Sequence, residues 1–196
     1  MTALPDAARA VLEFWFGAAD DPGHARARPQ WFTKDAAFDA AIANRFGAVL
    51  TQALAGQLGG WAAAPLSALA QVIVLDQFTR NVCRGQPRAF AGDALALAAA
   101  QAMVASGADR ALTGVQRQFV YLPFEHAEDL STQRESLRLF TQLEADMPAL
   151  KGLLDWAQRH HDIIQRFGRF PHRNAVLGRS SSEAELAFLQ TPGSAF

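Results

Sequence analysis

The chain of 196 residues is poor in cysteine, and it has no long apolar run free of charge. Cys83 is its one cysteine, so an internal disulfide is impossible, which fits a reducing cytoplasm. Glu13 interrupts the apolar stretch VLEFWFG near the N-terminus, so we expect no signal peptide. The richest apolar stretch, 89–105, contains Asp93 and is dominated by alanine. These features predict a cytoplasmic protein without a membrane-spanning segment.

Lysine is also scarce, because only two lysines accompany sixteen arginines. The net charge of −1 argues against attraction of nucleic acid to the whole surface. The segment 166–179, RFGRFPHRNAVLGR, nevertheless carries four arginines, and residues 163–182 include no acid. Its interleaved phenylalanines would suit nucleic acid, but the near-neutral charge and the apolar helix before it disfavour that partner. Six acidic residues lie in 125–146, and we expect part of this group to balance the basic segment.

Strand-like alternation is nearly absent, and helical periodicity takes its place. Apolar residues recur at steps of three and four, and glycines, prolines and small polar residues mark the helix ends. Asp6 is expected to cap the first helix and Gly17 to end it, while Ser131 and Thr132 are expected to cap a later one. The pattern predicts helices within 6–17, 34–56, 65–85, 88–107, 113–130, 131–146, 149–168 and 181–190.

No glycine- or serine-rich linker divides the chain, so we expect a single domain over residues 1–196. Seven or eight helices joined by short turns favour an all-α fold of antiparallel helical hairpins. No clean 34-residue repeat is visible, which argues against a strict repeat array.

Four polar clusters are unusual for a plain helical bundle. They are LDQFTRN with the arginines that follow it, YLPFEHAEDL, RHHDIIQRFGRF and the basic segment itself. Asp76 and Arg80 lie four apart, as do Asp162 and Arg166, so each pair can form an ion pair on one helix face. We predict one shared polar pocket. Its candidate ligand-binding residues are Asp76, Arg80, Asn81, Arg84, Arg88, Arg166, Arg169, His172, Arg173 and Asn174.

Candidate catalytic residues come from the two histidine-containing clusters. His126 or His161 would act as a general base, oriented by Glu125, Asp129 or Asp162. These five residues also have spacings that metal ligands use on a helix, but they do not form a recognised metal motif, so we expect neither metal nor cofactor.

Each candidate also has a purely structural interpretation. The Arg–carboxylate pairs could simply hold helices together, and His126 could be a hydrogen-bonded core histidine. Asn174 could brace a loop. The four tryptophans have apolar neighbours and are expected in the core.

Several motifs together resemble a known family. They are VLEFWFG, WFTKDAAFD, LDQFTRN, GQPRAFAGD, YLPFEHAED and HHDIIQRFGRFPHRNAVLGR. On these the chain is similar to the bacterial family filed as domain of unknown function number 924, from about residue 10 to the C-terminal GSAF. The resemblance implies an all-helical fold similar to tetratricopeptide-repeat proteins and no catalytic assignment. Thr79 departs from the family pattern, which more often has proline at this position.

Three functions remain open on these residues. The first, which we favour, is binding of a small anion bearing a phosphate or carboxylate, with arginines as the clamp. The second is an enzyme, a hydrolase or group transferase, that uses the same pocket with a histidine base. The third is a helical scaffold that binds peptides or proteins. An exposed groove would leave Arg169 and Arg173 accessible, whereas a closed pocket would bring His126 and His161 together with them.

Overall fold

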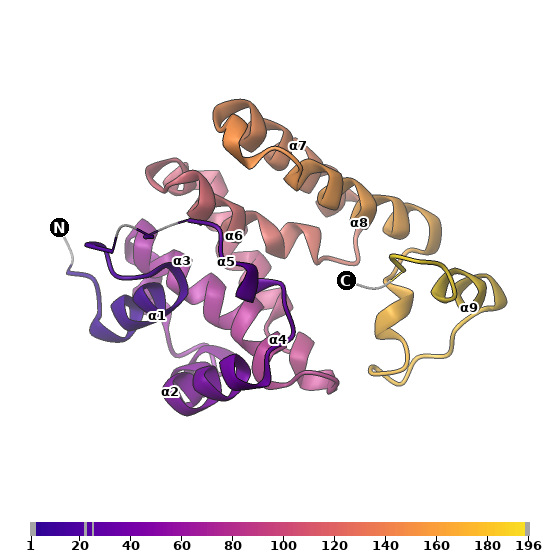
Figure 1. Cartoon of the computed structure of the whole chain (residues 1–196), viewed down its shortest axis with the longest axis horizontal. Helices are drawn as coiled ribbons and strands as arrows, with labels where there is room; N and C mark the ends of the chain where they lie inside the picture. Colours follow the sequence, from indigo (N-terminus) through magenta and orange to yellow (C-terminus); the bar gives the residue numbers. More distant parts are fainter. Residues whose placement is uncertain (1–2, 22, 25, 195–196) are drawn as a thin grey trace.

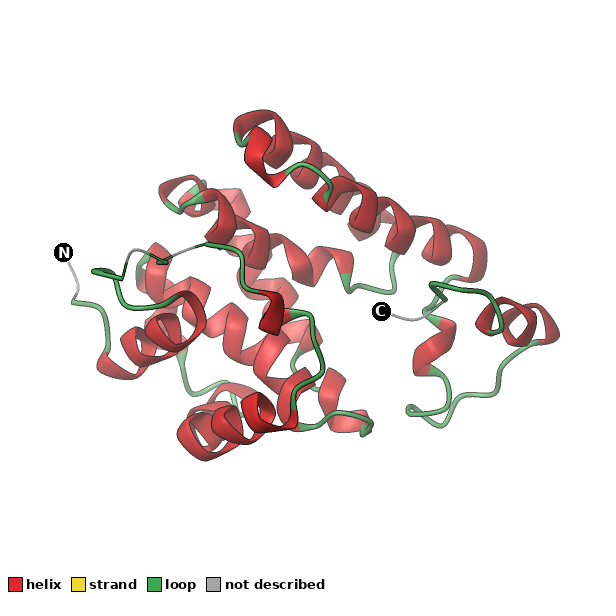
Figure 2. Cartoon of the chain, viewed as in Figure 1, coloured by secondary structure: helices red, strands yellow, loops and turns green. Residues whose placement is uncertain are grey.

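The computed structural model describes residues 3–21, 23–24 and 26–194, and this part of the chain is helical without strands (Figure 2). Its α-helices are α1 (Asp6–Phe16), α2 (Ala36–Leu54), α3 (Pro65–Ile73), α4 (Thr79–Val82), α5 (Asp93–Ser106), α6 (Gly114–Glu125), α7 (Leu130–Asp146), α8 (Leu153–Phe167) and α9 (Glu183–Leu189). A π-helical segment, Val74–Phe78, joins α3 to α4, and all three form one continuous helix. Counted this way, the described residues form eight α-helices, as the sequence predicts.

Consecutive helices pack against one another. α3 lies in the centre and contacts α1, α5 and α6, while α6, α7 and α8 follow one another as antiparallel hairpins. α7 and α8 run side by side along one edge of the molecule, and the C-terminal segment with α9 lies beside the end of α8 (Figure 1). The all-α class is thus confirmed, and the hairpin packing is compatible with a tetratricopeptide-like fold.

The main core gathers the apolar faces of α1 to α7. Trp15 and Trp31 stack with their ring centroids 5.9 Å apart, and Phe119 meets Trp31 edge-on at 4.8 Å. A smaller cluster holds the C-terminal segment, where Phe170 packs with Ile163 and Ile164 of α8. Trp156 departs from the expected core position, because it is 48% exposed on α8.

Two predicted helix caps are wrong. Pro5 takes the N-cap position of α1, and Asp6 is the first helical residue. Asp129 caps α7 by accepting from the Thr132 amide at 2.7 Å, in place of Ser131 and Thr132. An Asp, which is an equally good cap, stood only two residues earlier in the sequence. Gly17 does end α1 as predicted, and Gly168 ends α8 with a left-handed φ of 70°.

The stretch Pro87–Ser106 is long and apolar enough, by composition alone, to cross a membrane. In the fold it is divided between a 3₁₀ turn, η4 (Pro87–Phe90), and α5, which packs on α3 and α6.

Gly92 precedes α5 at a point where two backbones touch. A Cβ atom at this position would lie 2.1 Å from the carbonyl oxygen of Leu75 in the π-helical segment. Only glycine therefore lets the start of α5 approach this segment, and the approach positions Asp93.

Gly92→Ala is expected to lower the free energy of unfolding by about 1–3 kcal/mol or more, because backbone atoms must move apart. Urea unfolding measures the change. Gly47→Ala is the matched control, since nothing lies within 4 Å of its added Cβ and alanine favours helix α2. Equal stability of the Gly92→Ala variant and the wild type would show that this close approach is not a constraint.

Candidate functional site

Asp76 is a buried carboxylate in the π-helical segment, and it is 1% exposed. Its Oδ1 accepts from Arg80 Nη1 at 3.1 Å and lies 2.7 Å from His126 Nδ1, while its Oδ2 accepts from Gln77 at 2.6 Å. Segments of π-helix insert one extra residue per turn and occur often at functional sites. Here the wider turn places a charged side chain inside the molecule.

Thr79 stabilises the same segment. Its hydroxyl donates to the Leu75 carbonyl at 2.7 Å, so this carbonyl has a partner within the wider turn. A proline at this position would have no hydroxyl to donate. Arg80 and Asn81 stay in place beside it, within the same continuous helix.

Arg80 joins Asp76 to α5. Its two Nη atoms donate to the two carboxylate oxygens of Asp93 at 2.8 and 3.0 Å, a bidentate pair. Nη1 also donates to the backbone oxygen of Asp76 at 2.7 Å. The predicted Asp76–Arg80 ion pair is therefore present, and Asp93 is its third member.

The charge of Asp76 is fixed by this arrangement. Burial alone would raise the pKa of Asp76, but the charge of Arg80 and the hydrogen bond from His126 hold it well below its usual range. The carboxylate is consequently ionised at neutral pH and can only accept hydrogen bonds.

The tautomer of His126 follows from its partner. Because ionised Asp76 only accepts, His126 Nδ1 carries the proton in their 2.7 Å contact. Burial and the charge of Arg80 lower the pKa of His126, so the ring is neutral at pH 7. Its Nε2 is therefore an unprotonated base.

Glu125 and His160 form a second acid–histidine pair, and both members are buried. His160 Nδ1 lies 3.0 Å from Glu125 Oε1 and 2.9 Å from the Trp156 carbonyl. Burial and the charge of Asp76 raise the pKa of Glu125 to about 8, and burial is the main cause that lowers the pKa of His160 to about 3. The pair is thus neutral at pH 7, although its geometry would suit an ion pair.

Arg173 comes from a 3₁₀ turn, η7 (Pro171–Arg173), that follows the end of α8. Its guanidinium stacks on Phe90 and Phe170, 4.8 and 4.4 Å from the ring centroids. Nη1 lies 3.5 Å from Asp93 Oδ2, and Nε is buried with no hydrogen-bond partner among the described residues. Burial and the charge of Arg80 lower its pKa to about 10, so Arg173 is still a cation at pH 7.

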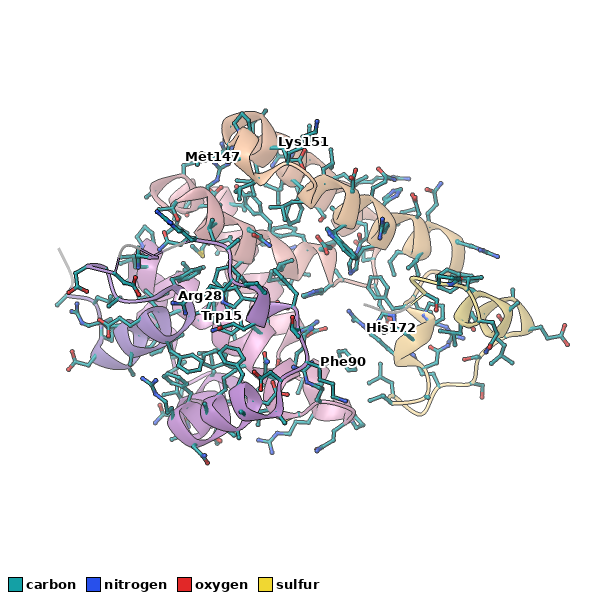
Figure 3. All side chains as sticks on the ribbon, in the orientation of Figure 1. Trp15, Arg28, Phe90, Met147, Lys151 and His172 are labelled. Carbon is teal, nitrogen blue, oxygen red and sulfur yellow. The ribbon has the colours of Figure 1, made fainter. Side chains whose placement is uncertain are left out.

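A cavity of about 530 Å³ connects these groups. Its charged and polar lining includes Arg80, Arg84, Glu125, His126, His160 and Arg173. Its apolar lining includes Trp31, Phe32, Phe90, Leu122, Phe140, Leu153 and Trp156. Two of the lining residues, Phe90 and His172, are labelled in Figure 3, and His172 belongs to the C-terminal segment. Burial and the charge of Arg173 lower the pKa of His172 to about 4, so it is neutral at pH 7.

The cavity collects about half of the predicted site residues. Those that line it are Arg80, Asn81, Arg84, Glu125, His126, His172 and Arg173, and Asp76 contacts Arg80 and His126. Those outside its lining are Arg88, Asp129, His161, Asp162, Arg166, Arg169 and Asn174. The sequence clusters therefore do not all converge on one pocket.

Several of the residues outside the cavity have structural partners. Asp129 caps α7, and Asp162 accepts from Gln158 at 2.7 Å instead of pairing with Arg166. Arg166 stacks on Phe167 with 4.7 Å to the ring centroid. Asn174 accepts from Arg179 at 3.0 Å and so braces the loop. Asn174 thus follows the structural interpretation that the sequence left open, whereas the predicted Asp162–Arg166 ion pair is wrong.

The basic segment is largely neutralised within the fold. Arg179 contacts Glu128 at 2.9 Å, and Arg169 contacts Glu185 at 2.6 Å. Glu128 belongs to the acidic group expected to face this segment, whereas Glu185 comes from α9. Arg173 is the arginine of this segment that lines the cavity.

Two site residues were missed from sequence. The sequence prediction names His161, whereas His160 lies in the site; His160 shares a stripe with Ala157 and Ile164, both buried, at helical steps of three and four. Asp93 is absent from the predicted site because it lies in an apolar, alanine-rich stretch; its one local signal is its place directly after Gly92, in the first turn of α5. Across the described part of the chain, no group of three or more His, Cys, Asp or Glu is arranged to hold a metal ion.

Comparison with known proteins supports the fold. The model of a family described as bacterial protein of unknown function (DUF924) matches residues 11–193. A solved structure of a protein of unknown function from Agrobacterium tumefaciens has 37% sequence identity and a TM-score of 0.81. The match covers 94% of this chain and 97% of that one. Nothing among the curated proteins matches the chain.

The raised pKa of Glu125 predicts a loss of stability with pH. Between its unfolded pKa near 4.5 and its folded pKa of about 8, the folded state holds a proton that the unfolded state has released. Stability therefore falls as pH rises through this window. The lowered histidine pKa values act in the opposite sense, and their contribution fades as pH rises above the ordinary histidine pKa of 6.5. From pH 6.5 to 8 we expect Glu125 itself to contribute a fall of about 1 kcal/mol per pH unit, read as the difference between the wild type and a variant without this carboxyl group.

Glu125→Gln is expected to remove this contribution to the pH dependence of stability, because an amide stays neutral at both pH 6.5 and pH 8. Urea unfolding at pH 6.5 and pH 8 measures it. Glu135→Gln, at a surface site that pairs with Arg138, should keep the wild-type slope. A Glu125→Gln slope equal to that of the wild type would show that Glu125 is ionised in the folded protein.

Proposed function

The chain belongs to the DUF924 family of bacterial proteins, and from its cavity we propose that it binds a small organic anion through Arg80 and Arg173. One observation carries this proposal. Two guanidiniums, the half-buried one of Arg80 and the buried one of Arg173, line a cavity of about 530 Å³, while their carboxylate partners, Asp76 and Asp93, are absent from its lining. The cavity therefore presents cations whose counter-charges are provided from outside it.

The chemistry of arginine favours this function. Guanidinium offers donors in a planar fork that matches the oxygens of a carboxylate or phosphate. Arg173 has a buried Nε without a partner among the described side chains and backbone, so the hydrogen bonding of this guanidinium within the described residues is incomplete. Leaving such a donor unsatisfied costs about 1–3 kcal/mol, which an acceptor oxygen would recover.

The burial of Arg173 makes a peptide-binding scaffold a weaker hypothesis. Arg173 is 6% exposed, whereas an open groove would leave it accessible. Arg169 is more exposed, but Glu185 holds it outside the cavity lining. His126, though not His161, lines the cavity with Arg173, which is closer to a closed pocket.

Arg173→Met tests the proposal, because methionine keeps the apolar contact with Phe90 and Phe170 and removes the charge. Benzoate and phenyl phosphate are the probes, and thermal unfolding is the measurement. A bound probe at a hundred times its Kd stabilises the wild type by about 2.7 kcal/mol. The increase in Tm should disappear in Arg173→Met.

Arg169→Met is the matched control, since it removes an arginine of the same segment that does not line the cavity. It should retain the response to the probes. The proposal is wrong if neither probe stabilises the wild type, or if the Arg173→Met variant responds as the wild type does.

The Asp76–His126 contact supports a second candidate, a hydrolase acting on an acyl ester. His126 Nε2 would take a proton from water, whose oxygen attacks the acyl carbon. The bond to the leaving oxygen then breaks, and His126 returns the proton to that oxygen. Asp76 stays ionised and orients the ring, and Arg173 would stabilise the negative oxygen that forms during the attack.

His126→Gln separates this reaction from binding. A p-nitrophenyl ester is the substrate, and release of p-nitrophenol is the readout. Loss of a general base is expected to lower the rate by about 10²–10⁴-fold, while benzoate binding persists. Equal hydrolysis by His126→Gln and the wild type would exclude His126 as the base.

A further inference from the structure

The cavity has different chemistry at its two ends. The residues of α6 that line it show how these two ends are arranged along the helix. Gln118, Leu122 and His126 line the cavity at steps of four residues, so they form one stripe along α6 and its C-cap. Eight residues of helix span about 12 Å. The C-terminal end of the stripe reaches His126, which contacts Asp76 and so lies beside Arg80.

α8 provides a second stripe in the same order. α6 and α8 are both antiparallel to α7, so they run in the same direction. Leu153, Trp156 and His160 line the cavity at steps of three and four, and His160 meets Glu125 at the end of α6. The N-terminal ends of both stripes, Gln118 and Leu153, therefore lie toward one end of the cavity, and their histidines lie toward the other.

Aromatic and aliphatic side chains dominate the end away from the histidines. Leu153 and Trp156 of α8 lie there, and Phe140 of α7 lines the cavity as well. Trp156 is 48% exposed, and Phe32, which lines the cavity from a neighbouring loop, is 65% exposed. Large apolar side chains left accessible beside a cavity suit contact with an apolar ligand.

The charges around the cavity allow only a small negative charge on the ligand. Arg80, Arg84 and Arg173 line it, and Asp76, Asp39 and Asp93 contact them. These three cations and three anions cancel. A polyphosphate would bring several uncompensated charges into a largely apolar space, whereas a single carboxylate brings one.

Building on the proposed function, we infer that the ligand is a monocarboxylate on an apolar, aromatic-sized body. Its carboxylate would lie at Arg80 and Arg173, and its body would extend along α6 and α8 toward Leu153 and Trp156. This ligand class differs from inorganic phosphate and from nucleotides in both its charge and its apolar length.

Calorimetric titration of the full chain tests the inference with four probes. They are 4-phenylbutyrate, acetate, inorganic phosphate and 4-phenylbutanol, which is an uncharged analogue of the first. We expect 4-phenylbutyrate to bind at least about tenfold more tightly than each of the others, because it alone uses both ends of the cavity.

Two variants test which residues recognise the apolar body and the carboxylate of the probe. Trp156→Ala should weaken 4-phenylbutyrate by about fivefold or more while leaving acetate unchanged, and its exposed ring makes the fold tolerant of the change. Leu186→Ala, at an exposed apolar residue of α9 outside the cavity lining, is the control and should bind like the wild type. Arg173→Met should remove the preference for 4-phenylbutyrate over 4-phenylbutanol.

The outcomes separate this inference from the proposed function. If phosphate or acetate binds as tightly as 4-phenylbutyrate, the apolar body is not recognised and the inference is wrong, but anion binding stands. If 4-phenylbutanol binds as tightly as the acid, the arginines are not used and both are wrong. Both are also overturned if none of the probes binds up to about 10 mM.

Discussion

The buried charge of Asp76 is the constraint on which the rest of the site depends. An ionised carboxylate inside a protein is stable only when cations and hydrogen-bond donors surround it. Arg80, His126 and Gln77 provide them, and they come from two different helices. Removing one partner of such a buried group typically costs about 3–5 kcal/mol, so the continuous helix of α3 and α4 and the end of α6 are held in one relative position.

This constraint also organises the cavity. Arg80 extends from Asp76 to Asp93, and Asp93 in turn approaches Arg173 from the C-terminal segment. Gly92 permits the close backbone approach that brings Asp93 into range. One network of alternating charges thus joins α4, α5, α6 and the turn after α8, and it leaves two guanidiniums and a neutral histidine facing one space.

The sequence predicts the helices well because their signals are local. Apolar residues at steps of three and four and glycines at helix ends mark each element, and the Asp76–Arg80 pair follows from spacing alone. The π-helical segment leaves no such signal, since it lies inside one continuous helix and the residues that flank it, Ile73 and Thr79, are α-helical. Ion-pair partners that are distant in sequence also leave no local signal. Glu185 of α9 binds Arg169, and Asp93 of α5 binds Arg80 of α4. The phase of α8 distinguishes its two histidines, because His160 lies on the buried face with Ala157 and Ile164 and His161 does not.

The central claim is that Asp76 holds His126 as a neutral ring with its proton on Nδ1. ¹⁵N NMR of histidine-labelled protein between pH 5 and 8 tests this directly, with His126→Gln to assign the resonances. The account predicts a protonated Nδ1 and a bare Nε2 at pH 7, with a His126 pKa below its ordinary value. An imidazolium at pH 7, or a neutral ring with its proton on Nε2, would contradict it.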